Sequence, residues 1–348
     1  MRAFPDGLPL WLWLGGTLLL AAAPAAAHAA APARAWVSNE DDGTVTLVDT
    51  EHLSALTSVV VGKRPRGLAL SRDGRRLFVA LSGMPKCPPP VTDEECAQLP
   101  RDRAADGVAV LDTATLELLR VFGGVTDPER VEVSRDGRAL YVSNEDAARL
   151  TVLDATRGTV IASAAVGREP EGVRASANGR WVLVTSEAQD SVAIIDTRTH
   201  AVLRSVAVGK RPRDLAITPD SRTAYVPGEA DASLYRFALP DGGPATKVLQ
   251  LRKEARPMGV VLDAKRARLY VSTGRAGTVA VISVTDGALV SEITVGARPW
   301  GLALSGDGRR LVTANGPSGE VAVIDTDTLA VLGKVSTGRG SWGVATAP

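Results

Sequence analysis

Aromatic side chains, histidine and net charge are all scarce in this chain of 348 residues. Aromatic residues make up 4% of the sequence, which argues against a surface on which bases or sugars stack. The formal net charge is +1, from 40 basic and 39 acidic residues, so we expect no general affinity for nucleic acid or anionic lipid. A binding function should therefore reside in local groups of side chains.

Common catalytic and cofactor motifs are also missing. The chain contains no nucleophile elbow, P-loop, H-E-x-x-H motif or C-x-x-C-H haem attachment motif. Beyond the N-terminal region the histidines are His52 and His200, and neither stands in a ligand-like spacing with Cys87 and Cys96. We therefore expect no cofactor and no metal ion. Catalysis stays open, with a non-catalytic role favoured.

The first thirty residues have a different composition from the rest. Arg2 precedes an apolar stretch at residues 8–23, which leads to the small residues Ala27-His28-Ala29. This order is typical of a secretory signal peptide, which we predict over residues 1–29 with cleavage near Ala29. The alternative is a retained membrane anchor, but the apolar run is short for a bilayer crossing. We expect the mature protein to be periplasmic or secreted, soluble and monomeric.

A short apolar run behind a proline returns along the chain at a nearly constant interval. Examples of the run are GLALS at 67–71 and DLAIT at 214–218. Successive prolines are separated by 63, 42, 42, 45 and 42 residues, and Ser341 takes the seventh position 42 residues later. The prolines are Pro65, Pro128, Pro170, Pro212, Pro257 and Pro299.

The spacing and the runs between the prolines predict an all-β fold. Each unit carries three further runs rich in Val, Ile, Leu and Tyr, and turns such as "RDGR" supply the glycine that a tight hairpin needs. Seven units of four antiparallel strands describe a single seven-bladed β-propeller over residues 34–348. The first repeat lacks its first strand, so we expect the C-terminal strand to pair with the three N-terminal strands and close the ring.

The long interval between Pro65 and Pro128 contains an insertion, residues 83–106, which holds both cysteines. In an oxidising compartment we expect Cys87 and Cys96 to form a local disulfide. The insertion interrupts a connection between second and third strands, so it should emerge on the face where the innermost strands begin, here called the upper face. We consider two interpretations: a partial lid or docking element over the channel mouth, or a surface decoration.

Several stretches resemble a known family of repeat proteins. They include "RAWVSNEDDGTVTLVDT", "VGKRPRGLALSRDGRRLFV", "ALYVSNEDAARLTVLD", "VGREPEGV" and "ARPWGLALSGDGRRLVTANGPSGEVAVIDT". The chain resembles the YVTN-repeat β-propeller family over residues 34–348, and it is most similar to exported propellers associated with PQQ-dependent alcohol catabolism. The resemblance implies a propeller fold and service to a periplasmic PQQ-linked oxidation system.

The residues on either side of each proline should surround the channel mouth on the upper face. Two consecutive positions are acidic, arginines flank them, and two tryptophans follow in adjacent units. Our candidate ligand- or partner-binding residues are Arg64, Arg66, Glu129, Glu171, Arg211, Arg213, Arg256, Arg298, Trp300 and Trp342. Arginine forks suit carboxylates or phosphates, and tryptophan suits an apolar body. The alternative is that these arginines and glutamates only neutralise one another.

We predict an exported, non-catalytic binding or scaffold protein that is accessory to a periplasmic PQQ-linked oxidation system. Its upper face would bind a small anionic or amphipathic ligand or a periplasmic protein partner, such as a PQQ-dependent dehydrogenase. The alternative is a lactonase-like hydrolase that uses carboxylates at the mouth, with Glu129, Glu169 and Glu171 as candidates. A haem d1-type propeller would need an axial ligand near the channel, whereas His52 and His200 fall in predicted lower-face turns.

Overall fold

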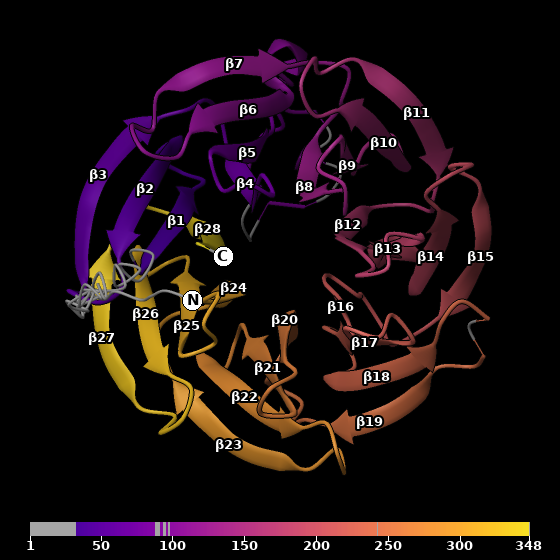
Figure 1. Cartoon of the computed structure of the whole chain (residues 1–348), viewed down its shortest axis with the longest axis vertical. Helices are drawn as coiled ribbons and strands as arrows, with labels where there is room; N and C mark the ends of the chain where they lie inside the picture. Colours follow the sequence, from indigo (N-terminus) through magenta and orange to yellow (C-terminus); the bar gives the residue numbers. More distant parts are fainter. Residues whose placement is uncertain (1–32, 88–90, 93–94, 97, 242, 348) are drawn as a thin grey trace, which may run out of the picture. The chain divides into compact units, whose positions relative to one another are not determined.

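Seven four-stranded antiparallel sheets form a ring around a central channel (Figure 1) in the computed structural model. The structure describes residues 33–87, 91–92, 95–96, 98–241 and 243–347. The predicted signal peptide, residues 1–29, lies outside the described residues. In the described part of the chain, no helix is long and apolar enough to cross a membrane.

Each sheet runs from an innermost strand at the channel to an outermost strand at the rim. The innermost strands are β4 (Pro65–Leu70), β8 (Pro128–Val133), β12 (Pro170–Ala175), β16 (Ala216–Ile217), β20 (Pro257–Asp263), β24 (Pro299–Leu304) and β28 (Ser341–Thr346). The second strands are β1 (Arg34–Asn39), β5 (Arg76–Leu81), β9 (Ala139–Asn144), β13 (Trp181–Ser186), β17 (Thr223–Gly228), β21 (Arg268–Thr273) and β25 (Arg310–Asn315).

The third strands are β2 (Thr44–Asp49), β6 (Gly107–Asp112), β10 (Arg149–Asp154), β14 (Ser191–Asp196), β18 (Ser233–Ala238), β22 (Thr278–Ser283) and β26 (Glu320–Asp325). The outermost strands are β3 (Ser54–Val60), β7 (Leu118–Phe122), β11 (Val160–Ala165), β15 (Val202–Ala207), β19 (Thr246–Gln250), β23 (Leu289–Thr294) and β27 (Val331–Ser336). Two short 3₁₀ turns, η1 (Arg103–Ala105) and η2 (Glu187–Gln189), lie between second and third strands of the described chain.

The ring closes as the repeat pattern predicts. Strand β28 pairs antiparallel with β1, with Trp36 opposite Ala345 and Val37 opposite Val344, so this sheet has the order β28-β1-β2-β3. The pairing covers the inner edge of β1, which would otherwise present unpaired backbone groups. The predicted all-β, seven-bladed fold is therefore confirmed.

The hydrophobic core lies between neighbouring sheets. One cluster joins Trp36 of β1 to Leu77 of β5, and another joins Trp181 of β13 to Ala224 of β17. Because the inner three strands of each sheet are covered on both faces, they read as nearly continuous apolar runs. Trp36 and Trp181 are therefore packing residues, as their positions inside strands predict.

A glycine two residues after the proline position lets adjacent innermost strands approach closely. A Cβ at any of these positions would lie within 2.8 Å of backbone atoms of the next sheet. The glycines are Gly67, Gly172, Gly259, Gly301 and Gly343. The other two sheets carry Arg130 and Asp214 at this position. These two exceptions shape the channel, as described below.

We expect Gly301→Ala to lower the free energy of unfolding by about 1–3 kcal/mol, because the backbone must shift to relieve overpacking. Its Cβ would lie 2.6 Å from the carbonyl oxygen of Trp342. Gly123→Ala is the matched control, since no atom lies within 4 Å of its added Cβ. Urea denaturation of both variants measures the difference. Equal stability of the two would contradict the close approach.

Candidate functional site

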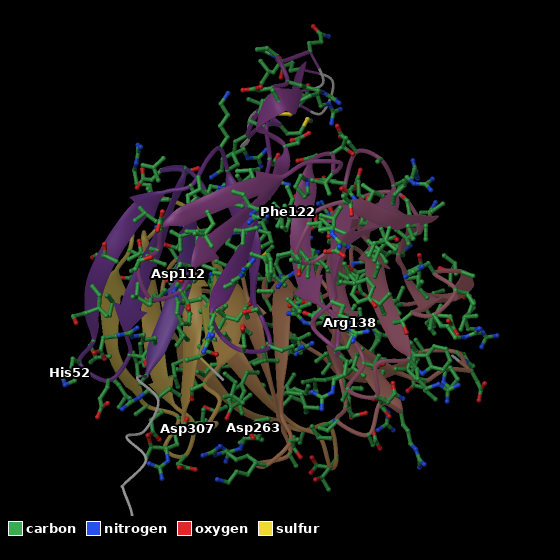
Figure 2. The ribbon with its side chains drawn as sticks, turned by 45° about the horizontal axis from the view of Figure 1, so that its top comes forward. His52, Asp112, Phe122, Arg138, Asp263 and Asp307 are labelled. Carbon is green, nitrogen blue, oxygen red and sulfur yellow. A yellow bond between two sulfur atoms is a disulfide. The ribbon has the colours of Figure 1, made fainter. Side chains whose placement is uncertain are left out.

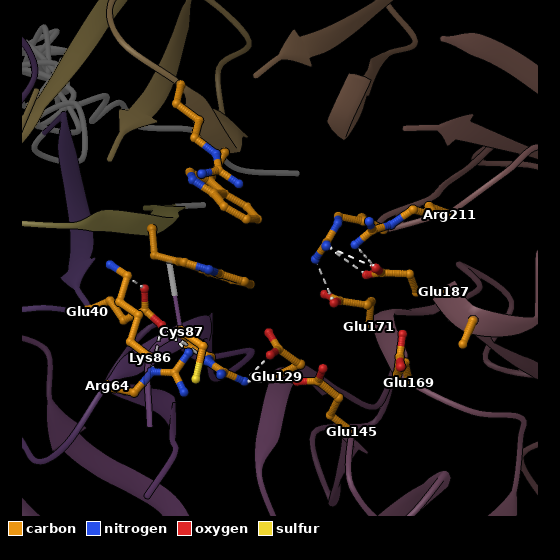
Figure 3. A pocket seen from close by; sticks show the side chains of 16 residues that line it. Glu40, Arg64, Lys86, Cys87, Glu129, Glu145, Glu169, Glu171, Glu187 and Arg211 are labelled. Carbon is orange, nitrogen blue, oxygen red and sulfur yellow. Dashed lines mark hydrogen bonds and ion pairs between the residues drawn. The ribbon is translucent and has the colours of Figure 1, made fainter. Parts of the chain in front are cut away.

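A cavity of about 590 Å³ opens on the upper face at the channel mouth (Figure 3). Its lining combines acidic, basic and aromatic side chains. They are Glu40, Arg64, Arg66, Lys86, Cys87, Glu129, Glu145, Glu169, Glu171, Glu187, Ala188, Arg211, Arg213, Arg298, Trp300 and Trp342. Nine of the ten candidate binding residues are in this set, and Arg256 is not.

The residue before each proline position has a backbone conformation that the sequence does not indicate. All seven residues there have positive φ, between 40° at Arg64 and 72° at Gly340. Left-handed conformations are uncommon for residues other than glycine and are retained where the surrounding structure enforces them. They occur here just before each chain enters its innermost strand. Arg64, Glu169, Arg211 and Arg298 line the cavity from such positions.

Arg66 is the centre of one buried ion-pair network. Its side chain is 5% exposed. Its Nη1 lies 3.2 Å from Asp127 Oδ1 and 3.5 Å from Glu145 Oε2, and it also donates to Glu129. Its Nε lies 3.5 Å from Glu40 Oε1. Because it is surrounded by carboxylates, Arg66 is occupied within the protein.

Arg213 is the centre of a second network on the far side of the acidic sector. Its nitrogens lie 2.7 Å from Glu171, 2.9 Å from Glu187 and 2.7 Å from Glu229. Arg211 pairs with the same Glu187, as the dashed lines in Figure 3 show. Glutamates therefore neutralise Arg66, Arg211 and Arg213 within the protein, as the alternative interpretation of the sequence predicts.

The two networks leave their carboxyl groups with very different proton affinities. Burial alone would raise the pKa of Glu40, but the positive charges of Arg66, Arg64 and Lys86 lower it to about 2. Burial raises the pKa of Glu145 to about 7, and the nearby Asp127 adds to this effect against the opposing Arg66. Burial likewise raises the pKa of Glu171 well above its usual value. Within the network around Arg66, Glu40 therefore has a lowered pKa and Glu145 a raised one.

Three carboxyl groups of this sector come close enough to share a cation. One oxygen each of Glu129, Glu145 and Glu171 lies within 4.8 Å of the other two. Such oxygens are ligands that Ca²⁺ and Mg²⁺ accept. Arg66 and Arg213 already supply positive charge to Glu129 and Glu171, however, so this trio needs no ion for neutrality.

Arg298 and two tryptophans form a different wall. Trp300 and Trp342 stack with ring centroids 5.9 Å apart and an interplanar angle of 22°. The guanidinium of Arg298 lies 4.8 Å from the Trp300 centroid, and within the described chain it has no carboxylate within ion-pair distance. An adjoining hollow of about 520 Å³ continues past these residues to Pro317. Arg298 is thus a cation that is free to take a partner from solution.

A buried ion pair crosses the channel below the cavity. Arg130 Nη2 lies 3.7 Å from Asp214 Oδ2, and Arg174 Nη2 lies 3.2 Å from the same oxygen. The space at this level is only about 10 Å³, about what a single water molecule needs. A separate hollow of about 440 Å³, lined by Arg174, Glu132 and other residues, lies toward the lower face.

Our sequence analysis missed this constriction, although a signal was present. Arg130 and Asp214 occupy the two positions where the other five repeats have glycine. The expected strand at 214–218 is also shortened to β16, Ala216–Ile217, because Asp214 turns its carboxylate onto the Leu215 amide at 2.9 Å and toward Arg174. A break in a repeated small-residue position marks where side chains enter the channel.

The insertion contributes two of the cavity residues, Lys86 and Cys87. Arg64 donates to the carbonyl oxygens of Met84 at 2.8 Å and Pro85 at 3.1 Å. The predicted disulfide between Cys87 and Cys96 is confirmed, and Figure 2 shows its sulfurs at one extreme of the molecule. These contacts attach the described part of the insertion to the mouth. Its role as a lid stays a prediction.

Comparison with known proteins places the fold among several propellers. A family model described as the cytochrome D1 heme domain matches residues 101–243. No curated protein matches the chain significantly. Hydrazine synthase of Kuenenia stuttgartiensis is similar in structure, with a TM-score of 0.70 and 21% identity over 84% of this chain and 92% of that one.

Two further solved structures share the fold at lower identity. A candidate 6-phosphogluconolactonase of Bacteroides uniformis has a TM-score of 0.71 and 18% identity, over 90% of this chain and 99% of that one. The dihydro-heme d1 dehydrogenase NirN has a TM-score of 0.63 and 15% identity, over 90% of this chain and 74% of that one. At these identities the similarity shows the propeller fold and nothing about activity.

The cavity does not provide the ligands that a haem d1 group would need. Haem iron takes an axial His, Met, Tyr or Cys thiolate. The cavity lining has no His, Met or Tyr, and its Cys87 is in a disulfide. His52 is exposed beside Asp49 and lies at the edge of the molecule in Figure 2, while His200 lies in the turn between β14 and β15. The residues at the mouth therefore do not fit a haem.

Proposed function

We propose that this chain is an exported, non-catalytic β-propeller that binds a small amphipathic anion in its upper cavity. We further propose that it serves a periplasmic PQQ-linked oxidation system, to which its resemblance to YVTN-repeat propellers points. The observation that carries the binding proposal is the wall of Arg298, Trp300 and Trp342. It offers an unpaired guanidinium next to an apolar surface, which is what an amphipathic anion requires.

The other mouth arginines support this assignment by contrast. Arg66 is buried and Arg213 is partly buried, and each contacts at least three carboxylates, so an incoming anion would have to displace these carboxylates. Arg298 is exposed and makes no such contact in the described chain. Binding of an anion at Arg298 costs no internal ion pair.

The chemistry of the lining supports a non-catalytic role. Among its side chains the groups able to act as nucleophile or base are Lys86, which pairs with Glu40 and Asp41, and the glutamates. Glu40, Glu129, Glu171 and Glu187 are each engaged by an arginine. The predicted signal peptide and the disulfide support export, because disulfides persist in oxidising compartments.

A genetic test addresses the proposed function directly. Deleting the gene should lower the rate of PQQ-dependent alcohol oxidation by intact cells of the source organism. The wild-type gene should restore the rate, whereas Arg298→Gln and Trp300→Leu should not, because they remove the anion contact and the apolar wall. Arg157→Gln, an exposed arginine on a lower-face turn, is the control and should restore the rate fully. An unaltered rate in the deletion strain would contradict the link to PQQ chemistry.

A lactonase-like hydrolase is the second candidate, favoured by one specific observation. Glu145 has a pKa of about 7 and lies close to Glu129 and Glu171, which suits a general acid or base near neutral pH. If this holds, the purified protein will hydrolyse a lactone such as δ-gluconolactone, and Glu145→Gln will reduce the rate at least about 100-fold. A pH-stat assay measures the rate. Hydrolysis equal to the buffer blank would remove this candidate.

A further inference from the structure

We infer that the upper cavity selects monocarboxylates with an apolar body and rejects dicarboxylates of the same shape. The inference rests on the proposed binding function and specifies its ligand class. It follows from how the charges are distributed around the ring rather than from their total.

One side of the mouth offers a single position for an anion. Arg298 precedes β24, and its guanidinium stacks on Trp300 at 4.8 Å without a carboxylate partner in the described residues. Lys86, the other cation near this side, is already paired with Glu40 at 3.2 Å and with Asp41. A ligand carboxylate therefore finds one available cation here.

The same side provides the apolar contact. Trp300 and Trp342 stack at 5.9 Å, and the adjoining hollow of about 520 Å³ reaches Pro317. This hollow and the main cavity of about 590 Å³ each lie in the range of about 300–1,000 Å³ that small-molecule sites occupy. An apolar body attached to the carboxylate would lie against the half-buried Trp300, which the buried Trp342 supports from behind.

The opposite side of the ring is acidic. In the order of sheets around the channel, β8 and β12 stand across from β24 (Figure 1). These strands and the segments next to them bring Glu129, Glu145, Glu169 and Glu171 to the cavity, labelled in Figure 3. Glu169 is exposed and has no ion pair with any described residue, although Arg211 and Arg213 act on its charge from a greater distance.

A second carboxylate on the far end of a ligand would therefore meet negative charge. Arg66 and Arg213 cannot compensate it, since their donors are used by Glu129, Glu171, Glu187 and their neighbours. Specificity of this kind comes from repulsion of the wrong ligand as well as attraction of the right one. A neutral far end that donates hydrogen bonds is compatible with the glutamates on this side.

Isothermal titration calorimetry with four matched probes tests this inference at pH 7.5. Naphthalene-2-carboxylate should bind at least about tenfold more tightly than naphthalene-2,6-dicarboxylate, naphthalene-2-carboxamide or acetate. Arg298→Gln should abolish the preference for the carboxylate over the carboxamide. Glu169→Gln should move the ratio of the two carboxylate affinities toward one, because it removes a cavity carboxylate that has no ion pair with the described residues. The lower-face control Arg157→Gln should leave both affinities as in the wild type.

Three results would overturn the inference: equal or tighter binding of the dicarboxylate, no effect of Glu169→Gln on the ratio, or no saturable binding of either carboxylate at millimolar concentration. The genetic test remains separate. If Arg298→Gln fails to complement while these probes do not discriminate, the cavity is functional and our ligand class is wrong. If Arg298→Gln complements fully, the proposed function itself is wrong.

Discussion

Replacing Arg66 with glutamine is expected to lower the free energy of unfolding by about 3–5 kcal/mol. The guanidinium is almost fully buried and contacts carboxylates from the two sheets on either side of its own. These partners are Glu40, Asp127, Glu129 and Glu145. Removing the one cation leaves several buried acids without compensation, which costs far more than the pair itself contributes.

The loss should also depend on pH in a defined direction. Without Arg66, the buried carboxylates hold protons more strongly in the folded state than in the unfolded chain. Groups with a raised folded pKa lose stability as pH rises toward that pKa. The deficit of Arg66→Gln relative to the wild type should therefore be larger at pH 8 than at pH 5. In the wild type Glu40, whose pKa is about 2, behaves oppositely and loses its contribution as pH falls from 4.5 to 2.

Arg339→Gln provides the matched control on the same face. Arg339 pairs with Asp42 at 2.6 Å, but its side chain is 79% exposed, so its loss should cost far less than the loss of Arg66. Urea denaturation at the two pH values measures both variants. A cost for Arg66→Gln as small as that of Arg339→Gln would show that Arg66 is not the centre of the network.

The repeated spacing predicted the fold because the same local signals occur in every unit. A proline, an apolar run and a glycine-containing turn define where each innermost strand begins and ends, and the unpaired strands at the two ends predict ring closure. The period alone also predicts that Arg64, Arg211 and Arg298 occupy equivalent positions in three different sheets around the channel mouth. These features are set by signals within one repeat unit of about forty residues, and the repetition of the unit makes the signals recognisable in the sequence.

Contacts between side chains of different sheets could not be read from the period. Arg66 is separated by 61 residues from Asp127 and by 79 residues from Glu145, and nothing local specifies that they meet. Arg256 stands at an equivalent position to Arg298 but does not line the cavity. The position of a residue in the repeat predicts where it lies around the channel. Its ion-pair partner depends in addition on the length of its side chain and on which neighbouring residue is acidic. For this reason only the structure could show that Arg298 has no carboxylate partner among the described residues.

The constriction below the cavity leads to the second large effect. Asp214→Asn is expected to lower the free energy of unfolding by about 3–5 kcal/mol. Asp214 is 3% exposed and is the shared partner of Arg130 and Arg174. Asparagine keeps the size and the hydrogen bond from the Leu215 amide but removes the charge. Two arginines would then face each other in the channel with one counter-ion fewer.

A double-mutant cycle separates this electrostatic cause from a loss of packing. Arg130→Gln combined with Asp214→Asn removes both charges, so the double variant should be more stable than Asp214→Asn alone, with a coupling energy of about 1–3 kcal/mol. Arg174 keeps Glu132, 3.9 Å away, as a remaining partner in the double variant. Chemical denaturation of the four proteins gives the coupling. Additive effects of the two substitutions would mean that the pair is not coupled. In the other five sheets the residue at this position is glycine, which has no side chain to form such a pair. If the double variant regains stability relative to Asp214→Asn, the cost of Asp214→Asn comes from the unpaired charge of Arg130 and not from lost packing.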